Sequence, residues 1–141
     1  MENAVLKRGA PHLALGRQGE EAAAALLRRA GLSILDRNWR SGRLELDLVC
    51  REGATVVFVE VKTRQSRQRG GPEAAITPAK QRSLSRAAQA WLAAHDAWDA
   101  PCRFDVVCLV ARHGTFSAEH YRHAFDFAPS LDRCHAPWQP W

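Results

Sequence analysis

The stretch from Leu44 to Lys62 reads LELDLVCREGATVVFVEVK, and the prediction of the fold starts from it. Residues 44–49 alternate apolar and acidic side chains, which is the period-two pattern of a half-buried strand. Residues 55–62 are rich in β-branched and aromatic side chains, which favour a second long strand. The short turn over 51–54 joins the two strands. The stretch therefore predicts an antiparallel hairpin.

Helical and strand patterns continue on both sides of this hairpin. The expected elements are a helix over 14–30, a strand over 32–38, the hairpin, a basic loop over 63–73, a helix that begins after Thr77, and strands over 104–110 and 115–121. Gly31 ends the first helix, and Thr77 caps the second helix with Pro78 at its first position. The apolar stripe of the second helix is Leu84, Ala88, Trp91 and Leu92. This order predicts an α/β fold with a mixed central sheet flanked by helices.

Length and composition limit the class of protein. A chain of 141 residues has room for one domain, which we expect over 14–127 between a flexible leader (1–13) and an irregular tail (128–141). With 46% hydrophobic and 25% charged residues, the chain is not a disordered protein. It has no apolar run of the length that spans a membrane and no apolar core of a secretory signal near its N-terminus. The four cysteines form no CxxC pair, so we expect buried reduced thiols in a cytoplasmic protein.

The hairpin also carries the residues that indicate chemistry. Alternation places Glu45 and Asp47 on one face of the first strand, and Glu60 and Lys62 on one face of the second. The opposite faces, with Leu44, Leu46 and Leu48 and with Val57, Val59 and Val61, are expected to build the core. Close carboxylates raise each other's pKa unless a cation lies between them, and Mg²⁺ or Mn²⁺ with oxygen ligands would supply that cation. Such a site suits metal-assisted hydrolysis of a phosphodiester. The alternative is a solvated sheet face with cross-strand acid–base pairs.

The first helix adds another acid. Glu20 follows Gly19 and lies at the border of the buried stripe, where the glycine would allow the helix to approach the sheet closely. Glu20 would then point along the seam between helix and sheet. The alternative is an ordinary acid near the start of a helix, favoured by the helix dipole.

Several strings, in order along the chain, resemble the YraN-like family of small bacterial proteins. They are Glu45–Val49, Phe58–Arg64, Gly71–Ala74, Thr77 with Lys80–Arg82, and Arg103–Val107, and the resemblance covers about residues 14–127. That family resembles a branch of the PD-(D/E)xK nuclease superfamily, near the archaeal Holliday-junction resolvases. The resemblance implies a restriction-endonuclease-like core and a phosphodiesterase site that uses a divalent metal.

The resemblance also implies roles for individual residues. Asp47 and Glu60 match the metal-binding carboxylates, and Lys62 matches the lysine of the motif. Glu20 matches a helix glutamate that supports the metal through water, and the main-chain carbonyl of Val61 would complete the metal shell.

Three further positions are less defined. Leu44 stands where the family usually has glycine, although it replaces no ligand. Glu45 could be a further ligand or a supporting acid. Gln81 lies where related nucleases often keep a side chain that orients substrate or lysine, and its alternative is a solvated helix position.

Basic residues cluster around these motifs. The three groups are Arg37, Arg40 and Arg43; Arg64, Arg67 and Arg69; and Lys80, Arg82 and Arg86. With 20 Lys and Arg against 15 Asp and Glu, the chain carries a net charge of +5, which suits a polyanionic partner. Phosphate contacts on both sides of a scissile bond would recognise the shape of DNA more than its sequence. Trp39 could stack on an unpaired base, although packing at the strand end is the favoured alternative. The pair His120 and His123 matches no standard zinc spacing.

The leading hypothesis is a metal-dependent nuclease that acts on DNA, including branched or damaged DNA. The alternatives are a non-catalytic nucleic-acid-binding or adaptor module on the same fold, and a nuclease directed at RNA. A homodimer is expected by analogy, because two sites related by a two-fold axis suit a symmetric junction.

Overall fold

The computed structural model describes residues 11–64 and 76–127. Its elements are α1 (Pro11–Arg29), β1 (Ser33–Ser41), β2 (Leu44–Glu52), β3 (Thr55–Arg64), α3 (Pro78–Ala94), β4 (Cys102–Arg112) and β5 (Thr115–Phe125). Every predicted helix and strand is confirmed, with α1 beginning before the expected residue and β1 running longer. The predictions for residues 1–10, 65–75 and 128–141, which include Arg67, Arg69, Gly71–Ala74 and Cys134, lie outside the described residues.

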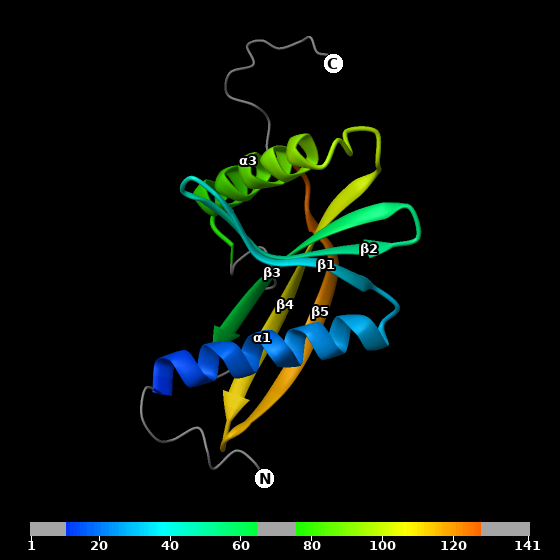
Figure 1. Ribbon diagram of the computed structural model, residues 1–141. Helices are drawn as coiled ribbons and strands as arrows, with labels where there is room; N and C mark the ends of the chain where they lie inside the picture. Colours follow the sequence, from blue (N-terminus) through cyan, green and yellow to red (C-terminus); the bar gives the residue numbers. More distant parts are fainter. Residues whose placement is uncertain (1–10, 65–75, 128–141) are drawn as a thin grey trace.

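The strands form one mixed sheet in the order β1-β2-β3-β4-β5. All neighbouring strands are antiparallel except β3 and β4, which are parallel. A parallel pair needs a crossover connection, and α3 lies in the connection between these two strands (Figure 1). The predicted α/β fold with a mixed sheet and flanking helices is thus confirmed, and it is consistent with a restriction-endonuclease-like core.

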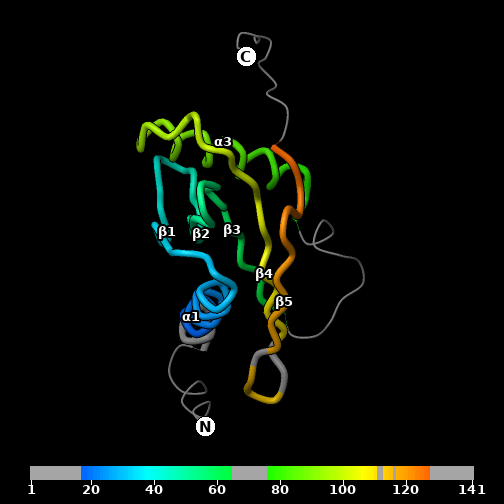
Figure 2. The backbone as a smooth tube through the Cα atoms, turned by 90° about the vertical axis from the view of Figure 1, so that its right-hand side faces the viewer, coloured from blue at the N-terminus to red at the C-terminus, as the bar shows by residue number. Residues whose placement is uncertain are grey.

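Each helix covers its own hydrophobic core. The α1 core consists of Ala23, Leu27, Leu32, Leu48, Cys50, Val57, Val59, Val107 and Leu109. The α3 core consists of Leu46, Val49, Val56, Phe58, Ile76, Leu84, Ala87, Ala88, Trp91, Leu92, Phe104, Val106 and Cys108. Successive residues of β3 and β4 alternate between the two cores, so both faces of the central strands are buried. In both views α3 lies at the top and α1 in the lower half, with β1 and β2 between them (Figures 1 and 2).

This double burial corrects the prediction of one aliphatic face and one open face. Phe58, on the face expected to carry the site, is buried in the α3 core. Leu48 packs in the α1 core but Leu46 packs in the α3 core, so the two leucines do not share a face as predicted. The alternation reverses at Asp47, and β1 changes face near Asn38, whose φ of 50° is left-handed. The β1–β2 hairpin therefore bends toward α3 where it passes the end of the β2–β3 ladder.

A helix cap and a glycine, both predicted from the sequence, position the two helices. Thr77 caps α3 by accepting the backbone N–H of Lys80 at 3.1 Å, and Pro78 follows it as predicted. Gly19 of α1 is buried against the sheet, as the prediction of a close approach requires. A Cβ atom added there would lie 3.1 Å from Leu109 Cδ1 and 3.2 Å from Thr63 Oγ1. Thr63 directly follows Lys62, so Gly19 sets how closely α1 approaches the end of β3.

Three of the four cysteines lie within the described residues. Cys50 and Cys108 are buried and Cys102 is half-buried, and none of these three forms a disulfide. Neither helix within the described ranges is long and apolar enough to cross a membrane. The cytoplasmic location stays a prediction.

Gly19→Val should lower the free energy of unfolding, because its branched side chain would overlap Leu109 and Thr63. We expect a loss of at least about 1 kcal/mol in urea denaturation, as for other overpacked sites. Gln18→Val is the control, because it places the same side chain at an exposed neighbouring position. Because valine has a higher helix propensity than glycine and a lower one than glutamine, propensity alone predicts a loss in Gln18→Val only. A loss in Gly19→Val no larger than that in Gln18→Val would therefore contradict the close approach.

Candidate functional site

Two carboxyl groups meet where β2 separates from β3. The β2–β3 ladder ends at the pair Leu48↔Val59. One residue beyond it, Asp47 Oδ2 accepts the backbone N–H of Val61 at 2.8 Å. Glu60, which is 8% exposed, directly precedes Val61 on β3, and Asp47 is near enough to raise the pKa of the Glu60 carboxyl. The predicted convergence of Asp47 and Glu60 is therefore present, at the end of the ladder instead of on an open face.

The backbone of Val61 contributes to the same point. In a β-strand, the N–H and C=O groups of one residue leave the strand on the same side. Since the Val61 N–H points to Asp47, the Val61 carbonyl also faces the β2 side of β3, beyond the last ladder pair. The Asp47 carboxylate and the Val61 carbonyl oxygen thus lie on the β2 side of β3, next to the position of Glu60.

Glu60 is an unusual carboxyl group. Its burial, followed by the charge of Asp47, raises the pKa of Glu60 to about 7, although Lys80 and Lys62 oppose this rise. Lys80 Nζ, from the first turn of α3, lies 3.7 Å from Glu60 Oε2. Lys62 is two residues from Glu60 on the same strand face. Burial and the neighbouring carboxylate favour the protonated form of Glu60 by raising its pKa, and a divalent cation would compete with that proton.

Gln81 supports the start of α3. Its side-chain Nε2 donates to the carbonyl of buried Ile76 at 3.1 Å, and its backbone N–H donates to the Thr77 carbonyl at 2.9 Å. Gln81 is half-buried, which differs from the solvated alternative, and its role in orienting substrate or lysine stays a prediction. Through it, Gln81 fixes the turn that carries Lys80.

Two other predicted acids do not join the pair. Glu45 is exposed and lies 3.7 Å from Arg40, its cross-strand neighbour near the hairpin tip. Glu20 is half-buried on α1, on the helix line of buried Ala23 and Leu27. Within residues 11–64 and 76–127, no three His, Cys, Asp or Glu side chains gather closely enough to hold a metal ion. A supporting role of Glu20 through water stays a prediction.

The basic residues divide into those that flank the site and those used elsewhere. Arg40 and Arg43 are exposed near the tip of the β1–β2 hairpin, and Arg82 is exposed on α3 beside Lys80. Arg64 is half-buried at the end of β3. Arg37 instead binds Glu21 of α1 at 2.6 Å. Trp39 packs against the α3 core, which confirms its expected packing role.

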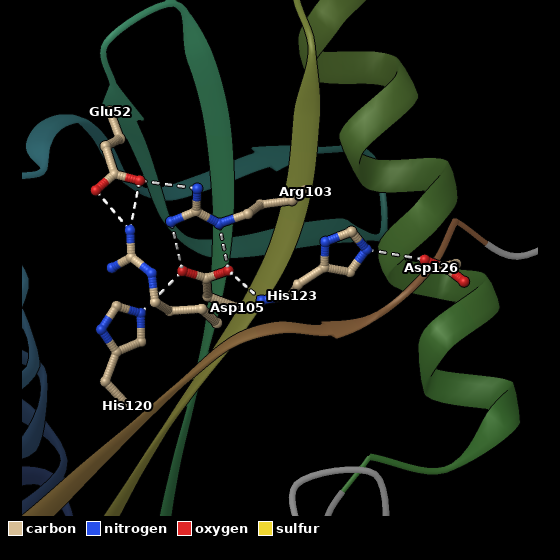
Figure 3. Close-up of polar contacts among 7 residues, drawn as sticks. Glu52, Arg103, Asp105, His120, His123 and Asp126 are labelled. Carbon is tan, nitrogen blue, oxygen red and sulfur yellow. Dashed lines mark hydrogen bonds and ion pairs between the residues drawn. The ribbon is translucent and has the colours of Figure 1, made fainter.

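A second polar cluster lies on β4 and was not predicted. Asp105, which is fully buried, accepts hydrogen bonds from Arg103 at 2.9 and 3.1 Å, and its Oδ2 lies 2.8 Å from His120 Nε2 (Figure 3). Arg103 continues to Glu52 at 2.9 Å, and Arg122 binds the same glutamate. The cluster thereby connects the end of β2 with β4 and β5.

The backbone of β5 is shaped around this carboxylate. Residues 122–124 of β5 lie opposite Asp105 alone, between the pairs Phe104↔Phe125 and Val106↔Tyr121. His123, with a left-handed φ of 51°, donates its N–H to Asp105 at 2.9 Å. Burial alone would raise the Asp105 pKa, but the contacts with His120, Arg103 and the His123 amide lower it to about 2. His123 Nε2 lies 3.0 Å from Asp126, so the two histidines of the sequence pair contact different acids.

The chain can be compared with known proteins. A family model described as "Uncharacterised protein family UPF0102" matches residues 19–109. The chain belongs to the UPF0102 family. A UPF0102 protein of Nitratidesulfovibrio vulgaris (strain DP4) is 52% identical over 128 residues, which cover 91% of this chain and 96% of the relative. A UPF0102 protein of Lawsonia intracellularis is 45% identical over 127 residues, or 90% of this chain and 96% of the relative.

UPF0102 is the YraN family, so the predicted family is confirmed. The range that matches the UPF0102 model includes Asp47, Glu60, Lys62 and Lys80, and also Asp105. The link from UPF0102 to the PD-(D/E)xK nucleases stays a prediction.

Stability should fall as pH rises through the range in which Glu60 ionises. A carboxyl whose pKa is raised from 4.5 to about 7 holds its proton more tightly when folded, so stability is lost between these values. Glu60→Gln should remove this pH dependence. At pH 8 its free energy of unfolding should exceed that of the native protein by on the order of 2 kcal/mol. Urea denaturation at pH 4, 6 and 8 measures the free energy of unfolding. Glu45→Gln is the control, because Glu45 is exposed. An unchanged pH profile in Glu60→Gln would contradict the assigned cause.

Asp105 should control stability in a separate, more acidic range. Because its pKa is lowered from 3.8 to about 2, its contribution is complete above pH 4 and is lost as pH falls toward 2. Asp105→Asn removes one of the two acidic partners of half-buried Arg103 and leaves it with Glu52, so we expect a loss of about 3 kcal/mol at neutral pH. The variant should also show a flatter profile below pH 4 in the same denaturation experiment. A loss that stays constant down to pH 2 would show that Asp105 acts by packing alone.

Proposed function

We propose that this protein is a metal-dependent nuclease that hydrolyses phosphodiester bonds in DNA. The observation that carries this proposal is the placement of Asp47 and Glu60 at the end of the β2–β3 ladder, where Asp47 accepts the Val61 N–H and Lys80 lies 3.7 Å from Glu60. A buried carboxyl beside a second carboxyl is costly to stability, so the placement of buried Glu60 next to half-buried Asp47 suggests a use other than folding.

The donor set fits a hard divalent cation. Mg²⁺ is commonly bound through one or two carboxylates, with water and substrate phosphate as its other ligands. Asp47, Glu60 and the Val61 carbonyl would hold Mg²⁺ or Mn²⁺ in this gap. When bound, such an ion polarises a phosphoryl oxygen and lowers the pKa of water.

The protein's own residues would do the remaining work. The Val61 N–H holds the Asp47 carboxylate in one orientation, so the site is arranged before substrate arrives. Lys62, on the same strand face as Glu60, would orient the attacking water or donate to the phosphate. Both roles need a side chain within reach of the Glu60 carboxyl, and Lys62 is close enough to lower its pKa.

Exposed cations near the site would bind the DNA backbone. Arg40 and Arg43 would contact phosphate from the hairpin side, and Arg64, Lys80 and Arg82 would do so from the side of β3 and α3. Such contacts recognise backbone geometry, which suits a substrate defined by shape, such as branched or damaged DNA.

Cleavage of labelled DNA by the purified protein tests the proposal. We expect a four-way junction or flap to be cut with Mg²⁺ or Mn²⁺ and to stay intact with chelator. Asp47→Ala and Lys62→Ala should each slow cleavage at least about 100-fold, as for other groups that stabilise a transition state. Asp99→Ala, an exposed acid in the α3–β4 connection, is the control and should cut normally.

Other outcomes would redirect the proposal. Binding without cleavage, unchanged in both variants, would support a non-catalytic nucleic-acid-binding module on this fold. Cleavage of RNA alone would change the substrate but not the chemistry. Cleavage that survives in both variants would contradict the assigned residues.

A further inference from the structure

Lys80 contacts the carboxyl pair from outside the strand motif. Its Nζ lies 3.7 Å from Glu60 Oε2, and its side chain is 47% exposed while that of Glu60 is 10% exposed. The ammonium group therefore reaches a buried oxygen from solvent, on the side where a phosphate would approach. The Lys80 ammonium group is thus within reach of both the Glu60 carboxyl and an anion that approaches from solvent.

The backbone beneath Lys80 is fixed, but its side chain is not. Thr77 accepts the Lys80 N–H, and Gln81 binds Ile76 and Thr77, so the first turn of α3 has little freedom. The lysine side chain is long and its ion pair at 3.7 Å is loose, so leaving Glu60 requires only rotation about side-chain bonds. Lys80 can therefore exchange partners without movement of the helix.

A divalent cation and the Lys80 ammonium group would compete for the same carboxylate. A doubly charged ion between Asp47 and Glu60 attracts Glu60 more strongly than Lys80 does, and it repels Lys80. The nearest anion that could then take the freed lysine is a DNA phosphate. We propose that Lys80 pairs with Glu60 when the site holds no metal and transfers to DNA phosphate when a divalent cation binds, which couples metal and DNA binding.

This inference rests on the proposed metal site and adds a measurable property to it. DNA that holds Lys80 removes a competitor from Glu60, so DNA should tighten metal binding. Linkage then requires that metal tighten DNA binding by the same factor. Arg82 provides the matched comparison, because it carries the same charge, lies on the same helix and is exposed.

Two binding measurements on the full chain test the coupling. Calorimetry gives the affinity for Ca²⁺, a hard cation that takes oxygen ligands. Fluorescence anisotropy gives the affinity for a labelled four-way junction, in EDTA and in saturating Ca²⁺ at constant ionic strength, with gels to verify that the junction is intact. In the native protein we expect Ca²⁺ to tighten junction binding about 5-fold or more.

The variants separate the coupling from simple charge. Lys80→Gln should bind Ca²⁺ more tightly than the native protein in the absence of DNA, and its junction affinity should no longer respond to Ca²⁺. Arg82→Gln should bind the junction more weakly in both conditions and keep the native coupling factor. Equal changes in the two variants would overturn the inference, because they would reflect net charge alone.

The outcomes also distinguish this inference from the proposed function. Native Ca²⁺ affinity and native coupling in Lys80→Gln would overturn the role of Lys80 and leave the metal site standing. Absence of Ca²⁺ and Mn²⁺ binding to the native protein would overturn both. Asp47→Asn verifies that the measured cation occupies the carboxyl pair, since it should abolish that binding.

Discussion

The hydrogen bond from the Val61 amide to Asp47 replaces the next rung of the β2–β3 ladder, and the site is arranged around it. A strand that leaves its neighbour exposes N–H and C=O groups, which cost free energy when they are buried without partners. Asp47 satisfies that N–H with its side chain, so β2 can turn toward α3 without this penalty. The same bond fixes a carboxylate at the point of divergence, so the bend in the sheet and the orientation of the acid have a single cause.

The two buried carboxyl groups of the central strands have pKa values shifted in opposite directions. Asp105 receives contacts from Arg103, His120 and the His123 amide, and its pKa falls to about 2. Glu60 lies on β3, one residue beyond Val59, which pairs with Asp105. Burial and the neighbouring Asp47 raise the pKa of Glu60 to about 7. Asp105 is thus fully compensated within the protein. The cations near Glu60 do not offset the effect of burial and Asp47 on its pKa. This difference in pKa separates a structural acid from a candidate metal ligand.

The sequence predicted the elements well because each has a local signal. Period-two alternation identified β2, β-branched and aromatic residues identified β3, and the Thr77–Pro78 cap identified the start of α3. The proximity of Asp47 and Glu60 was also predictable, because it follows from alternation along each strand and from the pairing of the two strands in a hairpin. The reversal of faces at Asp47 was not, because it depends on α3 covering the sheet face that a hairpin alone would leave open. Simple alternation therefore assigned Leu46 to the wrong core.

Contacts between distant elements were the least predictable part of the site. Nothing local indicates that Lys80 reaches Glu60, because that contact depends on the crossover through α3. The Asp105 cluster did have a local signal, since alternation places Arg103 and Asp105 on one strand face. Its partners His120 and Glu52 come from β5 and β2, and only the assembled sheet brings them together.

The distortion of β5 around Asp105 also affects how the protein behaves in a crowded solution. β5 is an edge strand of the sheet, and a regular edge offers its free N–H and C=O groups to any other extended chain. The three residues 122–124 that bulge opposite Asp105, with His123 in a left-handed conformation, interrupt that row of groups. The hydrogen bond from the His123 amide to buried Asp105 therefore keeps the edge irregular, which opposes the addition of further strands. The contact that stabilises the fold thus also opposes aggregation.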